Sequence, residues 1–345
     1  MSSVLFRPDL GWGECGPDNE MVATLRAELT SHNGIPGLEF CSPDEIDRAV
    51  RIFRRDGFVV VRDALDRTQL DLMQRASVRE LEQLLAIDTD RGGNRGSHRY
   101  SYGSSSRTGH MSHHREWAML MDLDTIRPIL TGIFDSADYF CRGGGGDVCL
   151  PGTLRYQPLH SDIGDRRRTA NPNGPGEITL GSFHDERGLL TLRDLPCMYV
   201  AANFLMNDLT PISGATRQIP GTQNSRQPIP SLADEPSWMR YSTVSPAPAG
   251  SVLLRDPRAW HGGTPNLTDE VRAIPNAEFY APWFYEPTPI SMPYEIYETL
   301  SDHGRHICRY MAARPGERIE TGYRANLGGT PGRLRTPDGP PRPQG

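Results

Sequence analysis

The sequence contains no lysine, and all 37 residues in its lysine-plus-arginine total are arginines. Lysine amines form Schiff bases and hold nucleotide phosphates in P-loop and protein-kinase sites. The absence therefore excludes pyridoxal-phosphate enzymes, lysine-dependent aldolases and both of those nucleotide-binding classes. Any permanently charged cation that binds an anionic ligand through a side chain must be an arginine.

Other common features are also missing. No apolar stretch is long enough to cross a bilayer, and the chain does not begin with a basic region followed by an apolar one. The net charge of −6 argues against a nucleic-acid partner, which would need a basic face. The six cysteines contain no CxxC pair. We expect a cytoplasmic protein with reduced thiols, whose partner is a small molecule rather than nucleic acid or membrane.

Glycine and proline are abundant, with 35 and 30 residues, which predicts many turns around a β-rich core. Short apolar segments separated by these residues predict the core strands near 148–157, 197–206, 215–219, 251–255 and 271–280. A β-sandwich or barrel with flanking helices is the fold class that this pattern favours.

Helical spacing of apolar residues precedes this core. It predicts one helix that starts after an N-cap at Ser42 and ends at Asp56, and a second over 67–87, with a strand over 58–61 between them. A last helix is expected over 292–313, and the proline-rich tail 334–345 is expected not to fold. We interpret residues 1–345 as a single catalytic domain with a helical part at about 40–130 and a β core at about 145–290.

Residues 88–114 are rich in small and polar residues and predict a long loop, either a lid over a substrate cavity or a surface excursion. The side chains in and near this loop that are best suited to an acidic or oxygenated substrate are Arg99, Tyr102, Arg107 and Arg115. His110 and His114 have the spacing of a helical metal pair, but a structural or substrate-contacting role is the stronger interpretation because no third ligand type lies nearby.

A His-x-Asp pair ends the first core strand. On an extended chain, residues two apart point to the same face, so His160 and Asp162 can present a nitrogen and an oxygen to one ion. His261 follows a later strand and supplies a second histidine. Two histidines and one carboxylate form the facial triad of non-haem Fe(II) oxygenases, which leaves positions open for a cosubstrate and O2.

Arg272 lies eleven residues after His261, on the next predicted strand. Its guanidinium can bind the far carboxylate of a dicarboxylate through two parallel hydrogen bonds, while the near 2-oxo acid chelates the metal. This is the recognition that 2-oxoglutarate requires.

Over roughly residues 44–285, the chain resembles the phytanoyl-CoA dioxygenase family of Fe(II)/2-oxoglutarate-dependent oxygenases. The shared features are the helix-then-strand entry at 53–60, the turn at 159–162, the Gly-(x5)-Pro-Gly-Thr pattern within 208–222, and the segment from Gly250 to Arg272. The resemblance implies a double-stranded β-helix of the jelly-roll, cupin-like kind. It also implies that His160, Asp162 and His261 hold iron and that Arg272 binds 2-oxoglutarate.

Some positions differ from relatives. Gln223 stands where many have a histidine, and Asn203 where some have an aromatic residue. Asn203 is a candidate contact for 2-oxoglutarate or the substrate, and Gln157 and Thr264 are candidates for 2-oxoglutarate. Because Asp162 is a carboxylate, the chain differs from halogenating relatives, which have a small residue there.

The expected function is hydroxylation of a small organic molecule in natural-product biosynthesis, with succinate and CO2 as coproducts. Desaturation, epoxidation and ring rearrangement use the same iron site and remain open, as does an acyl-CoA substrate. A non-redox metalloenzyme with the same ligands, or a catalytically silent β-helix that binds a ligand, is the alternative from another class.

Overall fold

The computed structural model describes residues 3–13, 15–164, 167–170, 177–180, 183, 185–287, 289–325 and 327. The tail that the sequence predicts for 334–345 lies outside these residues. Within them, none of the helices has the length and apolar character that crossing a membrane requires.

A seven-stranded mixed sheet forms the centre of the fold, in the order β1-β2-β9-β7-β11-β4-β3. Only β1 and β2 pair in parallel among the neighbours in this sheet. The strands are β1 (Phe40–Cys41), β2 (Phe58–Val61), β3 (Arg99–Ser101), β4 (Phe140–Cys149), β7 (Tyr199–Phe204), β9 (Val252–Arg255) and β11 (Arg272–Tyr280). Strands β11 and β4 pair along their whole length, with Arg272 opposite Cys149 at one end and Tyr280 opposite Phe140 at the other.

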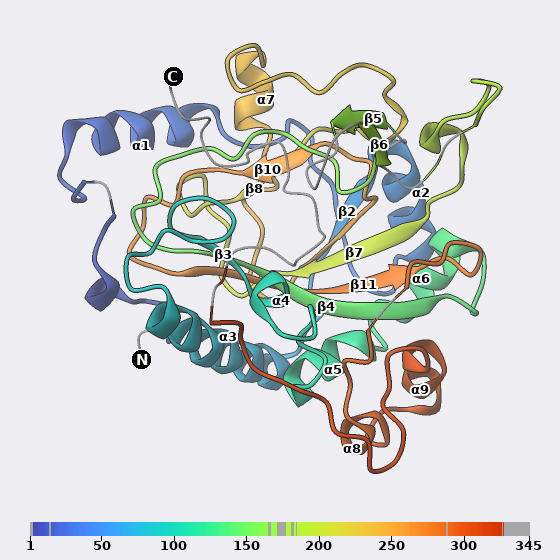
Figure 1. The fold of residues 1–345 in the computed structure, drawn as a ribbon. Helices are drawn as coiled ribbons and strands as arrows, with labels where there is room; N and C mark the ends of the chain where they lie inside the picture. Colours follow the sequence, from blue (N-terminus) through green and yellow to red (C-terminus); the bar gives the residue numbers. More distant parts are fainter. Residues whose placement is uncertain are drawn as a thin grey trace.

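A second, smaller layer faces the large sheet. It contains the antiparallel pair β8 (Thr216–Gln218) and β10 (His261–Gly263). The chain at 152–160 runs beside 261–266 and is joined to it by backbone hydrogen bonds, including both between His160 and His261. Among the described residues, strands β5 (Arg167–Ala170) and β6 (Glu177–Leu180) pair only with each other. Figure 1 shows β8 and β10 on one side of the large sheet and α3 and α5 on the other.

Most of the helices cover the outer face of the large sheet, whereas Figure 1 shows α1 (Glu20–His32) and α7 (Ser237–Tyr241) on the side of β8 and β10. The α-helices are α1 (Glu20–His32), α2 (Ile46–Asp56), α3 (Arg67–Ile87), α4 (Tyr102–Ser105), α5 (Arg115–Met121), α6 (Arg127–Phe134), α7 (Ser237–Tyr241), α8 (Tyr294–Tyr297) and α9 (Asp302–Cys308). A capping box between Asp66 and Gln69 starts α3, and Gly57 ends α2 in the left-handed conformation. The apolar sides of α2, α3, α5 and α6 pack in one hydrophobic cluster with the outward residues of β7 and β11.

Along each strand of the large sheet, successive side chains point alternately to this outer face and to the inner face. Leu205, Leu253 and Ile274 form an apolar cluster toward one end, and Phe140, Tyr199 and Tyr280 belong to another at the opposite end. Asn203, Asn276 and Arg255 occupy inward positions of β7, β11 and β9 between these clusters, and Arg272 lies at the start of β11, beyond Ile274. The polar site is therefore built between the two layers.

The predicted strand over 58–61 and helix over 67–87 are confirmed, as are the four later core strands to within two residues at each end. The predicted strand 148–157 is wrong in position, because β4 lies earlier and ends before a turn at Pro151 and Gly152. Strand β4 contains a run of four glycines, which have low strand propensity, so local sequence patterns do not predict this strand.

Three other expectations are corrected. The first predicted helix begins at Ile46, because residues 42–45 form a turn in which the Ser42 N–H bonds to the Glu45 carboxylate. The predicted helix 292–313 is split into α8 and α9, and Ser301 caps the second. Residues 88–114 are not a continuous loop, since they contribute β3 to the sheet and the buried helix α4.

Candidate metal centre

The three predicted metal ligands come together at the second layer. His261 begins β10, and its backbone exchanges two hydrogen bonds of 3.0 Å with His160 on the adjacent chain. This pairing sets the two imidazole rings 4.2 Å apart between centroids. Asp162 lies two residues after His160, and its N–H donates to the carbonyl of Pro257 at 2.8 Å. The backbone therefore brings all three residues to one point.

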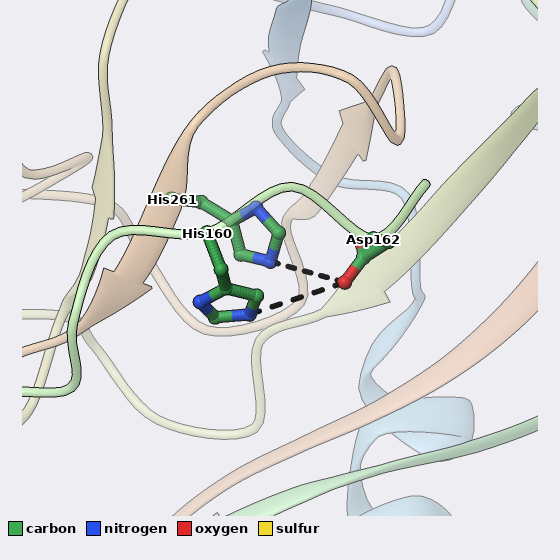
Figure 2. Close-up of side chains that lie close together, drawn as sticks. All are labelled: His160, Asp162 and His261. Carbon is green, nitrogen blue, oxygen red and sulfur yellow. Dashed lines mark ion pairs between the residues drawn. The ribbon is translucent and has the colours of Figure 1, made fainter. Parts of the chain in front are cut away.

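The side chains converge as a metal site requires. Asp162 Oδ1 lies 3.5 Å from His261 Nε2 and 3.9 Å from His160 Nε2. Figure 2 shows both imidazole rings turned toward this carboxylate. One ligand atom from each of the three residues lies within 4.8 Å of the others. The His261 side chain is buried, whereas those of His160 and Asp162 are 40 % and 30 % exposed. One side of the triad is thus open to a ligand.

Both imidazoles are oriented by a local hydrogen bond. Nδ1 of His160 lies 3.0 Å from the carbonyl of Pro158, and Nδ1 of His261 lies 3.0 Å from that of Ala259. Because a carbonyl only accepts, these contacts assign the proton to Nδ1 and leave the Nε2 lone pair free to bind a metal.

Electrostatics favour the protonation states that bind a metal. Burial, followed by the positive charge of Arg255, lowers the pKa of His261 to about 4. Burial opposes ionisation of Asp162, but the charges of His261 and Arg255 outweigh it and hold the pKa of the carboxyl well below its usual value. A neutral imidazole and an ionised carboxylate are the forms that coordinate cations.

Arg255, at the end of β9, binds the second oxygen of Asp162. Its Nη2 donates to Oδ2 at 2.5 Å, and its side chain is 9 % exposed. The turn that follows contains a second buried ion pair, in which Arg258 donates to both carboxylate oxygens of Asp256 and to two backbone carbonyls of 192–195. Sequence reasoning missed Arg255; the available signal was a charged residue at an inward position of a buried strand.

Arg272 lies on the inner face of β11 and is 5 % exposed. It pairs with Cys149 of β4, which on its other side pairs with Arg99 of β3, so the three residues form one row. Arg272 Nε and Arg99 Nη1 are buried without hydrogen-bond partners, and in the described part of the chain no carboxylate pairs with either guanidinium. Buried cations with free donors fit the distal carboxylate of 2-oxoglutarate, and the His-Asp-His donor set fits Fe(II).

The other predicted cosubstrate residues have partners within the protein. Gln157 accepts from Gly263 N–H and donates to the carbonyl of Arg95. The Asn203 amide donates to the carbonyls of Ala201 and Leu253, and the Thr264 hydroxyl donates to that of Ala215.

The four predicted substrate residues lie apart from one another. Arg99 is buried, with Nη2 bonded to the carbonyls of Arg155 and Thr264, rather than in a mobile lid. Tyr102 is fully buried in the outer core, where its hydroxyl donates to the carbonyl of Ser77 in α3. Arg107 pairs with Glu320, and Arg115 is exposed at the start of α5. The structure brings Arg99 alone of these four into the row with Arg272.

Comparison with solved structures gives low similarity. The α-ketoglutarate-dependent epimerase SnoN from nogalamycin biosynthesis shares 16 % identity over 69 % of this chain and 84 % of its own, with a TM-score of 0.49. HygX from Streptomyces hygroscopicus, solved with nickel, 2-oxoglutarate and hygromycin B, shares 17 % over 71 % and 91 %, with a TM-score of 0.48. The carbocyclase SnoK, also from nogalamycin biosynthesis, shares 15 % over 68 % and 83 %, with a TM-score of 0.44. These values are too low to support an argument about fold or substrate.

A protein-family model matches the part of the chain that contains the predicted site. Residues 148–274 match the family model described as phytanoyl-CoA dioxygenase (PhyH), and this range contains His160, Asp162, His261 and Arg272. The cofactors of this class are Fe(II), 2-oxoglutarate and O2. Over residues 148–274 the chain is thus similar to the phytanoyl-CoA dioxygenase family, and its enzyme class is that of the non-haem iron, 2-oxoglutarate-dependent dioxygenases.

Proposed function

We propose that this enzyme hydroxylates an unactivated C–H bond of a small organic molecule in natural-product biosynthesis, with release of succinate and CO2. The observation that carries the proposal is the His160, Asp162 and His261 triad, open on one side, together with the buried guanidinium of Arg272, which has no carboxylate partner among the described residues. The triad requires a metal, and the guanidinium requires an anion.

The residues have separate tasks in this proposal. His160, Asp162 and His261 hold the iron in a facial arrangement, and Arg272 binds the distal carboxylate of 2-oxoglutarate. Gln157, Asn203 and Thr264 shape the cosubstrate pocket, Gln157 by fixing Gly263 beside His261. Bound Fe(II) supplies the redox chemistry that activates O2, and the surrounding protein keeps bulk water from the reacting C–H bond.

We also propose that the two layers form a double-stranded β-helix within a single catalytic domain. Supporting this, the chain at 152–160 and β10 lie opposite the large sheet and carry the metal ligands, while β11 of the large sheet carries Arg272. Binding groups for metal and cosubstrate on opposite walls are what such a barrel offers.

Two features support the choice of reaction and substrate. Asp162 occupies the coordination position that a halide would need, which favours hydroxylation over halogenation. The net charge of −6 disfavours the phosphate groups of an acyl-CoA. A cytoplasmic location fits the free thiols of its six cysteines.

The test is succinate formation from 2-oxoglutarate by the Fe(II)-loaded protein, in air with ascorbate, against a panel of ring-containing metabolites and acyl-CoAs. We expect substrate-stimulated succinate formation by the wild type and none above background by Asp162→Ala. Product mass then distinguishes hydroxylation, a gain of one oxygen atom, from desaturation or rearrangement. Equal inactivity of both proteins with iron bound would overturn the proposal.

A further inference from the structure

The two oxygens of Asp162 have different surroundings. Oδ1 faces the Nε2 atoms of both histidines, at 3.5 Å and 3.9 Å. Oδ2 accepts a hydrogen bond from Nη2 of Arg255 at 2.5 Å. A charge-assisted bond of this length holds an oxygen firmly, so Oδ2 has a partner before any metal arrives.

Arg255 is itself held in place. It lies in β9, paired with Phe58 of β2 on one side and with Ala201 of β7 on the other, so its backbone is not at an edge of the sheet. Its side chain is 9 % exposed. On the other side of the contact, the Asp162 N–H bonds to the carbonyl of Pro257, two residues after Arg255. Both ends of the ion pair are thus fixed to the same strand and turn.

The number of carboxylate oxygens on the metal decides how many positions remain. A six-coordinate ion with three protein ligands has three positions left, two for a chelating 2-oxo acid and one for O2. A carboxylate that binds through both oxygens removes one of them, and free carboxylates adopt either mode. Holding Oδ2 away from the metal therefore preserves the position that the cosubstrates need.

We propose that Arg255 is a positioning residue that restricts Asp162 to binding the metal through Oδ1 alone. This inference rests on the metal centre proposed above. It assigns Arg255 a function beyond packing, because a structural ion pair would require no particular choice between the two oxygens.

The chain offers a matched control in the same turn. Arg258 is also buried and also pairs with a carboxylate, but that carboxylate is Asp256, which is not a metal ligand. Arg258→Met thus removes a comparable ion pair and weakens the same turn without freeing Oδ2. Arg255→Met removes the bond to Asp162, and Arg255→Lys retains the charge with a single donor point.

The experiment measures binding without turnover, with Mn(II) or Co(II) in place of iron and under anaerobic conditions. For each protein, metal affinity, 2-oxoglutarate affinity of the metal-loaded form and melting temperature are determined. For Arg255→Met at saturating metal, we expect a 2-oxoglutarate affinity lowered by about ten-fold or more. Arg255→Lys should restore part of the 2-oxoglutarate affinity, and Arg258→Met should lower only the melting temperature.

Wild-type 2-oxoglutarate affinity in metal-loaded Arg255→Met, or the same pattern in Arg258→Met as in Arg255→Met, would overturn the inference. A crystal structure of wild type with Mn(II) gives a readout independent of whether a variant folds. We expect Oδ1 on the metal and Oδ2 on Arg255, and two-oxygen coordination by Asp162 would refute the proposal. Failure of the wild type to bind any divalent metal would instead overturn the proposed function and this inference with it.

Discussion

Arg99 and Arg272 pair with the same residue, Cys149, from opposite sides, so two buried guanidinium groups lie in one row across three neighbouring strands. Burial lowers the pKa of Arg99, and the charge of Arg272 lowers it further. Each cation raises the free energy of the other in the absence of an anion, because neither has a carboxylate partner among the described residues. The row therefore favours binding of an anionic group such as the distal carboxylate of 2-oxoglutarate.

Arg272→Lys tests whether recognition depends on the guanidinium fork or only on charge. We expect the 2-oxoglutarate affinity of the metal-loaded protein to fall by about ten-fold or more, since an ammonium donates from one point and cannot form two parallel bonds. Titration calorimetry measures the change, with Arg107→Lys as the control because Arg107 is exposed and pairs with Glu320. An unchanged affinity would mean that another residue holds the distal carboxylate.

The fully buried ion pair between Arg217 and Glu235 predicts a large effect on stability. Arg217 Nη1 donates to both oxygens of Glu235, at 2.8 Å and 3.0 Å, and both side chains are 0 % exposed. Glu235→Gln leaves the buried cation without a counter-charge and should lower the free energy of unfolding by about 3–5 kcal/mol. The control is Arg240, which also pairs with Glu235 but whose side chain is 39 % exposed. Arg240→Gln should cost about 1 kcal/mol or less in the same denaturant titration, and equal costs would contradict this explanation.

Gly145 in β4 allows a close approach of the chain. A Cβ built there would lie 2.8 Å from the Cα and N of Gly103, which are backbone atoms that cannot turn away. We expect Gly145→Ala to lower the free energy of unfolding by about 1–3 kcal/mol through overpacking. At Gly16, a Cβ would meet nothing within 4 Å, so Gly16→Ala should leave stability unchanged or slightly raised. Matching melting temperatures for the two variants would refute the steric argument.

His113 predicts loss of stability in mild acid. Burial, and then the charge of His114, lower its pKa from 6.5 to about 4. Between pH 4 and 6.5, this histidine is protonated in the unfolded chain but neutral in the folded protein. The free energy of unfolding should therefore fall as the pH decreases from about 6.5 to about 4. His113→Phe removes this proton uptake and should flatten the slope of stability against pH in that range. His32→Gln, at an exposed position of α1, is the control, and an identical slope in all three proteins would contradict the assignment.

Much of the metal centre could be predicted from local sequence. His160 and Asp162 are two residues apart on extended chain, and His261 follows a strand whose pattern is clear. The His-x-Asp spacing is weak evidence by itself, and His261, Arg272 and the family resemblance together pointed to a shared site. The helix over 67–87 was equally accessible, because its capping box and apolar spacing are both local signals.

The parts that sequence reasoning missed depend on contacts between distant segments. The bond between Arg255 and Asp162 spans 93 residues, and the row of Arg99 and Arg272 exists only because β3 and β11 both pair with β4. Strand β4 itself was misplaced because its glycines pack against neighbouring backbone, which no local propensity records. Tertiary packing determines these features, and propensity and periodicity report only local structure.

Metal-dependent binding of 2-oxoglutarate tests the central claim most directly. Anaerobic titration of 2-oxoglutarate into the wild-type protein should give one site per chain when Fe(II) is present. When the metal is removed by chelation, the affinity for 2-oxoglutarate should fall by about ten-fold or more. Asp162→Ala and His261→Ala should behave like the metal-free wild type. Equal 2-oxoglutarate binding by the wild type with and without Fe(II), or no binding by either, would contradict the account of this chain as an Fe(II)/2-oxoglutarate dioxygenase.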